Sequence, residues 1–458
     1  MKWFFALNET SGYFDAYSKM IRVAVYTAYR YTSLQPHFIY DGDDNALTRW
    51  LEERQVKIIR RRSSMYNALK RLTEEKQQDW LSTGAGAFLR VDIPIIMSEN
   101  GWDDEYVLYT DCDIMFTQDV DFSGIQCKYF AVAPESGVKD NVNINTGVMI
   151  MNIPALLKDI RNFHLFIEQY LHIFAILDWD QTAYRTYYHL EWDHLKPTDN
   201  WKPYWGLNPD ARIVHFHGPK PTSTEEVRQG AVSQSIKELI DRAGSSYFEM
   251  VEVWERCLRE SEQCFHFTRR DDAPRGSFSS AAYPFEAEIT LLRSQVIAGS
   301  QFANLCNFDE HGLCDWRAVK GKLILWLFGN LENVAAHLTV SNFFSLIGNL
   351  EAEMWYLDYT NRHFPHNLDV ITRMGQNLYR QGKPDQAIQA YRAALDIEPQ
   401  NQDILFSLAK LCFDIQDYAG ALNYLRRILQ INPADQEALA GLRLVMQQPR
   451  PAGLIELV

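Results

Sequence analysis

Short apolar runs alternate with amphipathic stretches at the start of the chain. Residues 2–8, 37–40 and 56–59 are dense in aromatic and β-branched side chains and predict strands. Between them, residues 13–31 and 47–54 carry apolar side chains at helical spacing. This β-α-β-α-β order is typical of a parallel sheet whose strands are joined by crossover helices, so the sequence predicts an α/β domain here.

A further apolar run, Tyr106–Tyr109, predicts a strand buried on both faces, and it leads into Asp111 and Asp113. Because an unpaired carboxylate is costly in a core, both aspartates should lie beyond the carboxyl end of the strand, where open α/β sheets bind ligands. On extended backbone the two side chains leave the same face and can hold one divalent cation. A solvated turn would also explain an isolated Asp-x-Asp, but the buried strand and the residues downstream favour the metal site.

Two more apolar runs follow, over residues 129–133 and 148–151, and both predict strands. The segment Asn145–Gly147 precedes the second run and would place an amide and a flexible backbone at the sheet edge. A plain turn explains this segment equally well. Residues 162–177 then predict a long apolar helix.

The sequence offers two imidazoles and a lysine after the last short apolar run of this region, at His215, His217 and Lys220. A histidine beside a strand is usually structural. However, an imidazole that completes a metal site and a lysine that reaches a phosphate are the groups that the aspartate pair still needs.

Composition narrows the class of protein. The chain has 458 residues, 47% of them hydrophobic, which predicts a globular protein of two or three domains. A formal net charge of -14 argues against a general nucleic-acid binder. The seven cysteines show no metal or disulfide spacing, and no stretch approaches the roughly 18 apolar residues of a membrane span. We therefore expect a soluble cytoplasmic protein with reduced thiols, without a signal peptide and without nucleic-acid partners.

The region from residue 222 to about 365 is mostly helical, apart from a polar loop over residues 267–282, and shows no evident catalytic chemistry. Cys306 and Cys314 flank His311, which could indicate a metal site. Buried thiols in an apolar helical setting are the better interpretation.

The C-terminal part of the chain repeats every 34 residues. Small, aromatic or proline positions recur at this spacing: Gly375, Ala387, Tyr391 and Pro399 return as Ala409, Ala421, Leu425 and Pro433. This period identifies tetratricopeptide repeats over residues 368–401 and 402–435, with a capping helix at 436–447. Pro365 keeps the same phase, so a degenerate repeat is predicted before them. Two repeats are too few to stand alone and should stack on the middle helices as one α-solenoid.

Taken in order, these motifs make residues 1–221 resemble glycosyltransferase family 8, the retaining GT-A enzymes that include glycogenin and the lipopolysaccharide galactosyl- and glucosyltransferases. The matching segments are Ala6-Leu-Asn8, Phe88-Leu-Arg90, Asp111-Cys-Asp113, Asn145-Thr-Gly147, Asp180-Gln181 and His215-Phe-His-Gly218-Pro-Lys220-Pro221. Gly218 and Lys220 are one residue closer than in the family pattern, and no tryptophan follows Pro221. His217 therefore remains an alternative to His215 as the metal ligand.

The resemblance implies a role for each of these residues. Asp111, Asp113 and His215 would hold Mn²⁺ or Mg²⁺ on the diphosphate of a UDP-sugar, and Lys220 would help to neutralise the UDP leaving group. Gln181, or else Asp180, would stabilise the oxocarbenium-like centre, and Asn145 would position the sugar. The residues implied in nucleotide-sugar binding are Ala6, Asn8, Arg90, Asp111, Gly147, Gly218 and Lys220.

The predicted architecture is an α/β GT-A (Rossmann-like) catalytic domain, followed by an all-α region that ends in a tetratricopeptide-repeat solenoid. We expect the GT-A domain at residues 1–221, a helical middle region at 222–366, the repeats with their capping helix at 367–447 and a tail at 448–458. The repeats would recruit a protein or glycan acceptor or mediate homodimerisation, since the C-terminal helices and residues 454–458 leave apolar surface to be covered.

The leading hypothesis is a metal-dependent retaining glycosyltransferase that moves a hexose from a UDP-sugar to a protein or glycan acceptor. A second hypothesis is a tetratricopeptide scaffold whose GT-A domain is inactive, although both aspartates that such a loss normally removes are present. A third is a metal-dependent nucleotidyltransferase, which also starts from a nucleotide on a carboxylate-bound metal.

Overall fold

A computed structural model describes the chain except for residues 123, 141, 264–285 and 449–458. The chain forms two compact units, Met1–Tyr283 and Pro284–Val458. The loop predicted over residues 267–282 and the apolar segment 454–458 lie outside the described residues. The finer domain boundaries stay a prediction.

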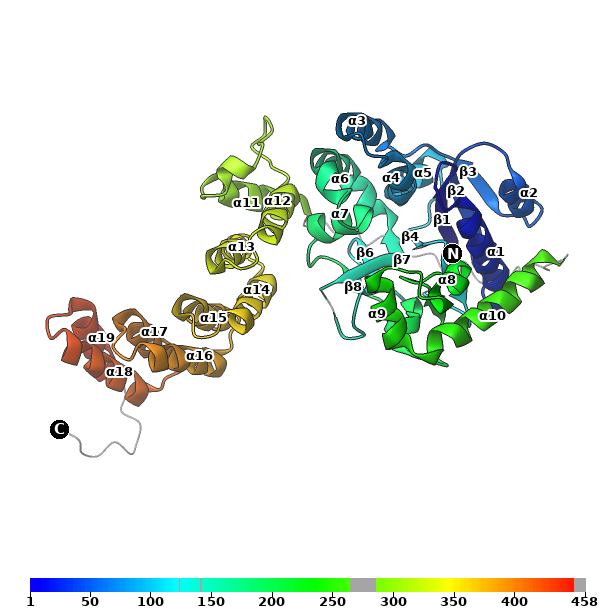
Figure 1. The fold of residues 1–458 in the computed structure, drawn as a ribbon. Helices are drawn as coiled ribbons and strands as arrows, with labels where there is room; N and C mark the ends of the chain where they lie inside the picture. Colours follow the sequence, from blue (N-terminus) through cyan, green and yellow to red (C-terminus); the bar gives the residue numbers. More distant parts are fainter. Residues whose placement is uncertain (123, 141, 264–285, 449–458) are drawn as a thin grey trace. The chain divides into compact units, whose positions relative to one another are not determined.

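The first unit is built on a seven-stranded sheet with the strand order β3-β2-β1-β4-β7-β6-β8 (Figure 1). Its strands are β1 (Lys2–Asn8), β2 (Gln35–Asp41), β3 (Lys57–Arg60), β4 (Tyr106–Thr110), β6 (Phe130–Pro134), β7 (Ile144–Asn152) and β8 (Asp193–His194). Strands β3, β2, β1 and β4 are parallel, as the β-α-β-α-β pattern predicted. The predicted α/β class is confirmed for this unit.

The parallel arrangement does not extend across the whole sheet. Strand β7 runs antiparallel to both of its neighbours, β4 and β6. The chain between β6 and β7 is too short for a crossover helix, so these two strands must pair antiparallel. Strand β7 also begins earlier than predicted, so Asn145–Gly147 lies within the sheet and is buried.

Helices connect the strands and cover the sheet. They are α1 (Phe14–Tyr31), α2 (Ala46–Glu52), α3 (Tyr66–Lys76), α4 (Leu81–Ala87), α5 (Ile93–Glu99), α6 (Ile153–Phe174) and α7 (Trp179–Tyr187). The short 3-10 helices are η1 (Phe88–Asp92), η2 (Pro197–Asn200) and η3 (Pro203–Trp205). The predicted start of α6 at residue 162 was too late, because Asn152 accepts the backbone N–H of Ala155 as an N-cap and Pro154 lies in the first turn.

Three more helices belong to the first unit: α8 (Thr224–Arg228), α9 (Gln234–Ala243) and α10 (Ser245–Glu262). Helix α10 runs beside α1 (Figure 1), and the two share an apolar cluster that includes Val23, Tyr247 and Trp254. The hydroxyl of Tyr26 on α1 donates to Glu260 on α10 at 2.6 Å.

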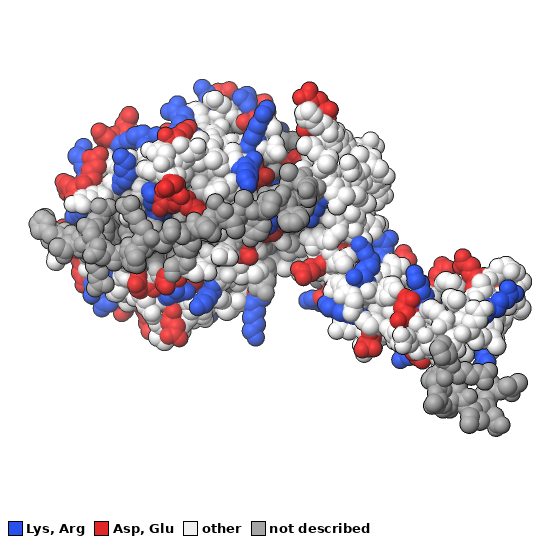
Figure 2. All heavy atoms as spheres, turned by 180° about the vertical axis from the view of Figure 1, so that it is seen from behind, with Lys and Arg blue, Asp and Glu red and all other residues white. Residues whose placement is uncertain are grey.

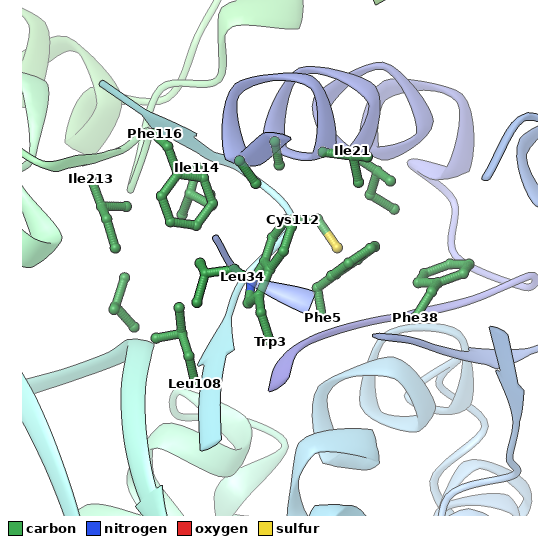
Figure 3. Packing of buried hydrophobic residues seen from close by; sticks show 14 of the residues in the cluster. Trp3, Phe5, Ile21, Leu34, Phe38, Leu108, Cys112, Ile114, Phe116 and Ile213 are labelled. Carbon is green, nitrogen blue, oxygen red and sulfur yellow. The ribbon is translucent and has the colours of Figure 1, made fainter. Parts of the chain in front are cut away.

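The main core lies between α1 and the sheet (Figure 3). Trp3 and Phe5 of β1 pack there with Ile21 of α1, and all three are at most 1% exposed. Phe116 meets the Trp3 ring edge-on at 5.2 Å between centroids. Burial of each such side chain contributes roughly 1.5–3 kcal/mol, so this cluster holds the carboxyl ends of the strands in fixed positions.

A separate two-stranded sheet joins β5 (Ile114–Phe116) to β9 (Ile213–His215). The strands are antiparallel, and Ile114 lies opposite His215. This pairing brings the segment after β4 next to a segment far along the chain.

The second unit consists of paired helices. They are α11 (Glu286–Ala298), α12 (Trp316–Phe328), α13 (Val334–Leu346), α14 (Leu350–His363), α15 (Leu368–Arg380), α16 (Pro384–Ile397), α17 (Gln402–Asp414), α18 (Tyr418–Ile431) and α19 (Gln436–Met446). From α12 onward, alternate helices begin 34 residues apart: α12, α14, α16 and α18 form one series, and α13, α15, α17 and α19 the other. The predicted all-α region with repeats is confirmed, and its register extends back to Trp316.

The first helix of each pair in this register begins at a capping side chain. Asn333, Asn367, Asn401 and Asp435 each accept a backbone N–H from the first turn of α13, α15, α17 and α19. Such a cap satisfies one of the N–H groups that a helix start leaves unpaired. The capping hydrogen bonds therefore recur with the same 34-residue period as the packed helices.

Charged side chains of both signs are mixed on the surface. On the face of the molecule in Figure 2, acidic and basic side chains lie interspersed over the first unit and form no extended basic area. Among the described residues, no helix has the length and apolar character needed to cross a membrane.

The cap at Asn401 yields a test of the solenoid. Asn401→Ala should lower the free energy of unfolding of the repeats by about 1 kcal/mol, because it leaves the N–H of Ile404 without its acceptor. Urea denaturation followed by far-UV circular dichroism measures this change. Asn401→Ser keeps an acceptor oxygen without setting a second carboxylate beside Glu398, and it should stay within a few tenths of a kcal/mol of the parent. Equal losses in both variants would contradict the capping role.

Candidate metal and donor site

The candidate site forms where β4 gives way to β5. Strand β4 ends at Thr110, the backbone bends at Cys112 and Asp113, and β5 begins at Ile114. The backbone N–H of Phe216 donates to the carbonyl of Asp113 at 2.9 Å, which continues the β5–β9 pairing. Because of this pairing, the aspartate segment and the end of β9 share one location.

Asp111, Asp113 and His215 converge there. Nε2 of His215 lies 3.3 Å from Oδ1 of Asp113 and 3.8 Å from Oδ2 of Asp111. One ligand atom from each residue lies within 4.8 Å of the other two. The side chains of Asp113 and His215 are 4% and 1% exposed, whereas that of Asp111 is 30% exposed, so the cluster opens to solvent on the Asp111 side.

The two aspartates differ from the sequence-based expectation in one respect. The backbone bends between them, and Asp113 is buried within the site rather than lying beyond the core. Its charge is compensated, because Lys220 forms an ion pair with its Oδ2 and His215 lies beside Oδ1. Burial alone would raise the pKa of Asp113, but the Lys220 ammonium and the His215 ring hold it well below its ordinary value.

These residues have the character of a divalent-cation site. Oδ1 of Asp113 is buried and accepts no well-aligned hydrogen bond within the described part of the chain. Buried polar atoms normally have partners, so a carboxylate oxygen without an aligned donor, beside another carboxylate and an imidazole, fits a position where a cation can bind. Two carboxylates and one imidazole suit Mn²⁺ or Mg²⁺. Burial lowers the pKa of His215, which favours the neutral ring that a metal requires, although Asp113 partly offsets this effect.

Arg90 connects the aspartate cluster to α7. Its Nη2 donates to Oδ1 of Asp111 at 2.7 Å, and its Nε lies 2.8 Å from Oδ2 of Asp180. Its Nη1 donates to the carbonyl of Thr146 at 2.6 Å, and its guanidinium lies over the Tyr109 ring. Burial raises the pKa of Asp180 above its ordinary value although Arg90 lies beside it. Arg90 and Asp180, both predicted from the motifs, thus form one buried ion pair next to Asp111.

Asn145 and Gln181 form a second group beside the first. Oε1 of Gln181 accepts the backbone N–H of Thr146 at 3.0 Å and lies 3.3 Å from Nδ2 of Asn145. Gln181 lies in the first turn of α7, directly after Asp180. The oxygen of Gln181 is therefore committed to strand β7, which fixes the orientation of its amide.

Two residues near this group, Asn200 and Glu135, were not identified from the sequence. Asn200 lies between His215 and Asn145 and forms hydrogen bonds with both, of 2.9 and 2.8 Å. Glu135 accepts from Asn145 at 2.8 Å, and Nε2 of His217 lies 2.9 Å from its other oxygen. Burial raises the pKa of Glu135, but His217 and Asn145 outweigh it and lower the pKa to about 2. Asn200 and Glu135 belong to no sequence motif. They can be identified only when it is known which residues, distant in sequence, they contact.

The two candidate imidazoles lie in different surroundings. His215 lies with the aspartates, whereas His217 lies against Glu135 and the hydroxyl of Tyr204, which is 3.1 Å from its Nδ1. Lys220 reaches Asp113 despite the shortened spacing to Gly218. Gly218 has a φ of +91°, a conformation that favours glycine.

The remaining predicted residues lie near the ends of β1. The Asn8 side chain is buried and donates to the carbonyl of Ser82 at 2.7 Å, so it holds α4 close to the sheet. The carbonyl of Ala6 accepts from the thiol of Cys112 at 3.2 Å. Their implied role in nucleotide-sugar binding stays a prediction.

Gly147 is required by close packing. It lies next to Asp111 in the β4–β7 ladder, where its carbonyl accepts the Asp111 N–H at 2.8 Å. A Cβ added at this glycine would lie 2.2 Å from Cε1 of His215 and 2.9 Å from Oδ2 of Asp111. No side chain fits here without displacing the candidate ligands.

Residues 378–445 match the tetratricopeptide repeat family model. No curated protein sequence matches the chain significantly.

Several solved structures resemble parts of the chain. The glycosyltransferase GlyE of Streptococcus pneumoniae TIGR4 is 17% identical over 57% of this chain and 63% of its own, with a TM-score of 0.38. The galactosyltransferase LgtC, solved with donor and acceptor sugar analogues, is 15% identical over 54% of this chain and 96% of its own, with a TM-score of 0.37. MamA from Desulfovibrio magneticus RS-1 is 22% identical over 24% of this chain and 63% of its own, with a TM-score of 0.24.

These matches agree with the resemblance that the motifs predicted, over 54–57% of the chain for the two glycosyltransferases. The chain spans less than two thirds of the GlyE structure. At identities this low the likeness concerns the fold alone. The function must therefore be inferred from the side chains of the site.

The close packing at Gly147 gives a direct test of the site. Gly147→Ala should weaken Mn²⁺ binding at least tenfold, because the methyl group would displace His215 or Asp111. Isothermal titration calorimetry with Mn²⁺ measures the affinity. Gly12→Ala is the matched control, since a Cβ there has no neighbour within 4 Å, and it should bind Mn²⁺ like the parent. Unchanged affinity in Gly147→Ala would contradict this account of the site.

Proposed function

We propose that this protein is a metal-dependent retaining glycosyltransferase that moves a hexose from a UDP-sugar to a protein or glycan acceptor. The observation that carries the proposal is the convergence of Asp111, Asp113 and His215, in which a buried carboxylate oxygen of Asp113 accepts no well-aligned hydrogen bond from the described residues. The motif resemblance supports the same conclusion.

Asp111, Asp113 and His215 would hold Mn²⁺ or Mg²⁺. The cation, when bound, supplies positive charge that polarises the diphosphate and stabilises the UDP leaving group. Asp111 is the most exposed of the three and so leaves the site accessible to a nucleotide from that side. Lys220 already lies beside Asp113 and adds a second positive group close to where the leaving phosphate would be.

The second group of residues would handle the sugar. Arg90 holds Asp111 and Asp180 together and fixes the carbonyl of Thr146, so it connects the metal side of the site to β7. Asn145 and Gln181 present their amides from the same edge. Groups held this rigidly can stabilise the charge that develops on the sugar without first reorganising. Same-face attack at an oxocarbenium-like centre requires such stabilisation.

The acceptor would be recruited through the second unit in this proposal. Stacked tetratricopeptide repeats present an extended concave surface on which partners bind. Homodimerisation through the C-terminal helices stays a prediction. In support of it, α19 exposes Leu444 and Met446, by 49% and 67%.

A panel of sugar nucleotides tests the function. The full-length protein is incubated with Mn²⁺ and UDP-glucose, UDP-galactose or UDP-N-acetylglucosamine, and free UDP and pyrophosphate are both measured. UDP release that disappears with EDTA and in Asp113→Asn supports the proposal. Pyrophosphate release would instead indicate a nucleotidyltransferase, and the absence of both binding and turnover would indicate an inactive scaffold.

The metal assignment predicts unequal effects at the two imidazoles. His215→Ala should weaken Mn²⁺-dependent UDP binding at least tenfold, because it removes a ligand atom. His217→Ala should have a smaller effect, since that ring contacts Glu135 and Tyr204 instead. Calorimetry of UDP binding with and without Mn²⁺ compares them. Equal or reversed effects would move the ligand assignment to His217.

The role proposed for Gln181 predicts a loss confined to catalysis. Gln181→Ala should lower kcat by about tenfold or more while the affinity for the UDP-sugar changes little, because the amide would act in the transition state. Steady-state kinetics and donor binding by calorimetry separate the two quantities. A variant that loses donor affinity and keeps kcat would contradict this role.

A further inference from the structure

Asn200 links the candidate metal site to the Asn145–Gln181 group. It ends the 3-10 helix η2 and is 0% exposed. Its Oδ1 lies 2.9 Å from Nδ1 of His215, and its Nδ2 donates to Oδ1 of Asn145 at 2.8 Å. One buried amide therefore contacts one member of each group.

Two groups with unambiguous roles fix the direction of these hydrogen bonds. The backbone N–H of Gly147 can only donate, and it donates to Oδ1 of Asn145 at 3.1 Å. The ionised carboxylate of Glu135 can only accept, and it accepts from Nδ2 of Asn145 at 2.8 Å. With both ends of Asn145 fixed, Asn200 must turn its Nδ2 toward Asn145 and its Oδ1 toward His215. An amide oxygen can only accept, so Nδ1 of His215 must carry a proton.

The tautomer decides which nitrogen can bind a metal. A neutral histidine has one ring proton, and a proton on Nδ1 leaves the lone pair on Nε2. Nε2 is the nitrogen that faces Asp111 and Asp113. Histidine ligands in metal sites typically donate their other N–H to a fixed acceptor. In this chain the acceptor is the side-chain oxygen of Asn200.

We propose that Asn200 is a positioning residue that selects the Nδ1–H tautomer of His215 and orients the amide of Asn145 through the same side chain. The assignment of a metal to Nε2 rests on the proposed function. The tautomer is a property of the protein itself.

The far end of this chain of hydrogen bonds is held by His217 and Tyr204. Nε2 of His217 lies 2.9 Å from Oε1 of Glu135, and the hydroxyl of Tyr204 donates to the backbone carbonyl of Glu135 at 3.0 Å. These contacts keep Glu135 in place as an acceptor for Asn145. His217 thereby gains a role as an anchor of Glu135, separate from metal binding.

The first test reads the tautomer directly. The full-length protein is labelled with ¹⁵N-histidine, and two-bond ¹H–¹⁵N correlations are recorded without metal at pH 8, with His215→Ala used to assign the ring. We expect the Nδ1–H form of His215 in the parent and its loss in Asn200→Ala. An Nε2–H ring in the parent would overturn the proposal.

The second test measures Mn²⁺ affinity in two variants. Asn200→Ala should bind Mn²⁺ at least tenfold more weakly, because the ring of His215 loses its acceptor. Asn200→Asp keeps an oxygen for Nδ1–H and should bind Mn²⁺ within about threefold of the parent. The aspartate also sets an oxygen against Oδ1 of Asn145, so any sugar transfer should fall even though metal binding is retained. Equal Mn²⁺ affinity in a folded Asn200→Ala variant would overturn the proposal.

A double variant shows whether Asn200 acts through His215. In the His215→Ala background, Asn200→Ala should cause no further loss of Mn²⁺ affinity. A full additional tenfold loss would show that Asn200 acts by another route. Thermal unfolding of each variant identifies any that do not fold. If Asn200→Ala does not fold, the Mn²⁺ affinity of Asn200→Asp and the ¹⁵N spectra decide whether the proposal holds. If no UDP-sugar is turned over but these results hold, the proposed function fails and the role of Asn200 stands.

Discussion

The antiparallel pairing of β5 with β9 is the constraint on which the candidate site depends. It sets Ile114 opposite His215 and so places an imidazole beside two aspartates that come from a distant part of the chain. Ile114, Phe116 and Ile213 are buried in the main core with Trp3, whereas Met115 and Val214 are buried in the cluster shared by α1 and α10. The packing that stabilises the unit therefore also fixes the positions of the ligands. A site built on paired strands is held more accurately than one built on loops.

The charges gathered at this point are stable because each has a partner. Asp113 has Lys220 and His215, and Arg90 is shared between Asp111 and Asp180. Burying any one of these ions alone would cost several kcal/mol, and pairing within the site offsets that cost. Within the described residues, Oδ1 of Asp113 accepts no well-aligned hydrogen bond, and the same holds for Nε of Arg90 and Oδ2 of Asp180, which face each other. At Asp113, which lies beside Asp111 and His215, a bound cation would explain this. Perturbed carboxylates gathered in one place mark a candidate functional site.

Much of the first unit follows from local pattern, because buried strands and amphipathic helices have distinct periodicities. The aspartate pair could also be located, since two charges must follow a buried strand. The antiparallel direction of β7 and the burial of Asn145 could not be predicted from local pattern, because both depend on which strands pair. Asn200 and Glu135 were not identified from the sequence for the same reason, because each is an isolated polar residue whose partners are distant in sequence.

The solenoid also shows a limit of recognition from sequence, because the structure continues the repeat where the sequence pattern is absent. Its 34-residue register runs back to Trp316, yet the family model covers only residues 378–445. The position held by Ala387 and Ala421 in the two clear repeats is Glu353 in the preceding one. That carboxylate is buried in α14, and Nη1 of Arg380 lies 3.1 Å from it. Where the two clear repeats carry a small residue that allows close helix packing, the preceding one thus carries a buried carboxylate with a partner on the next repeat. The helices keep their spacing while the sequence loses the pattern by which a repeat is recognised.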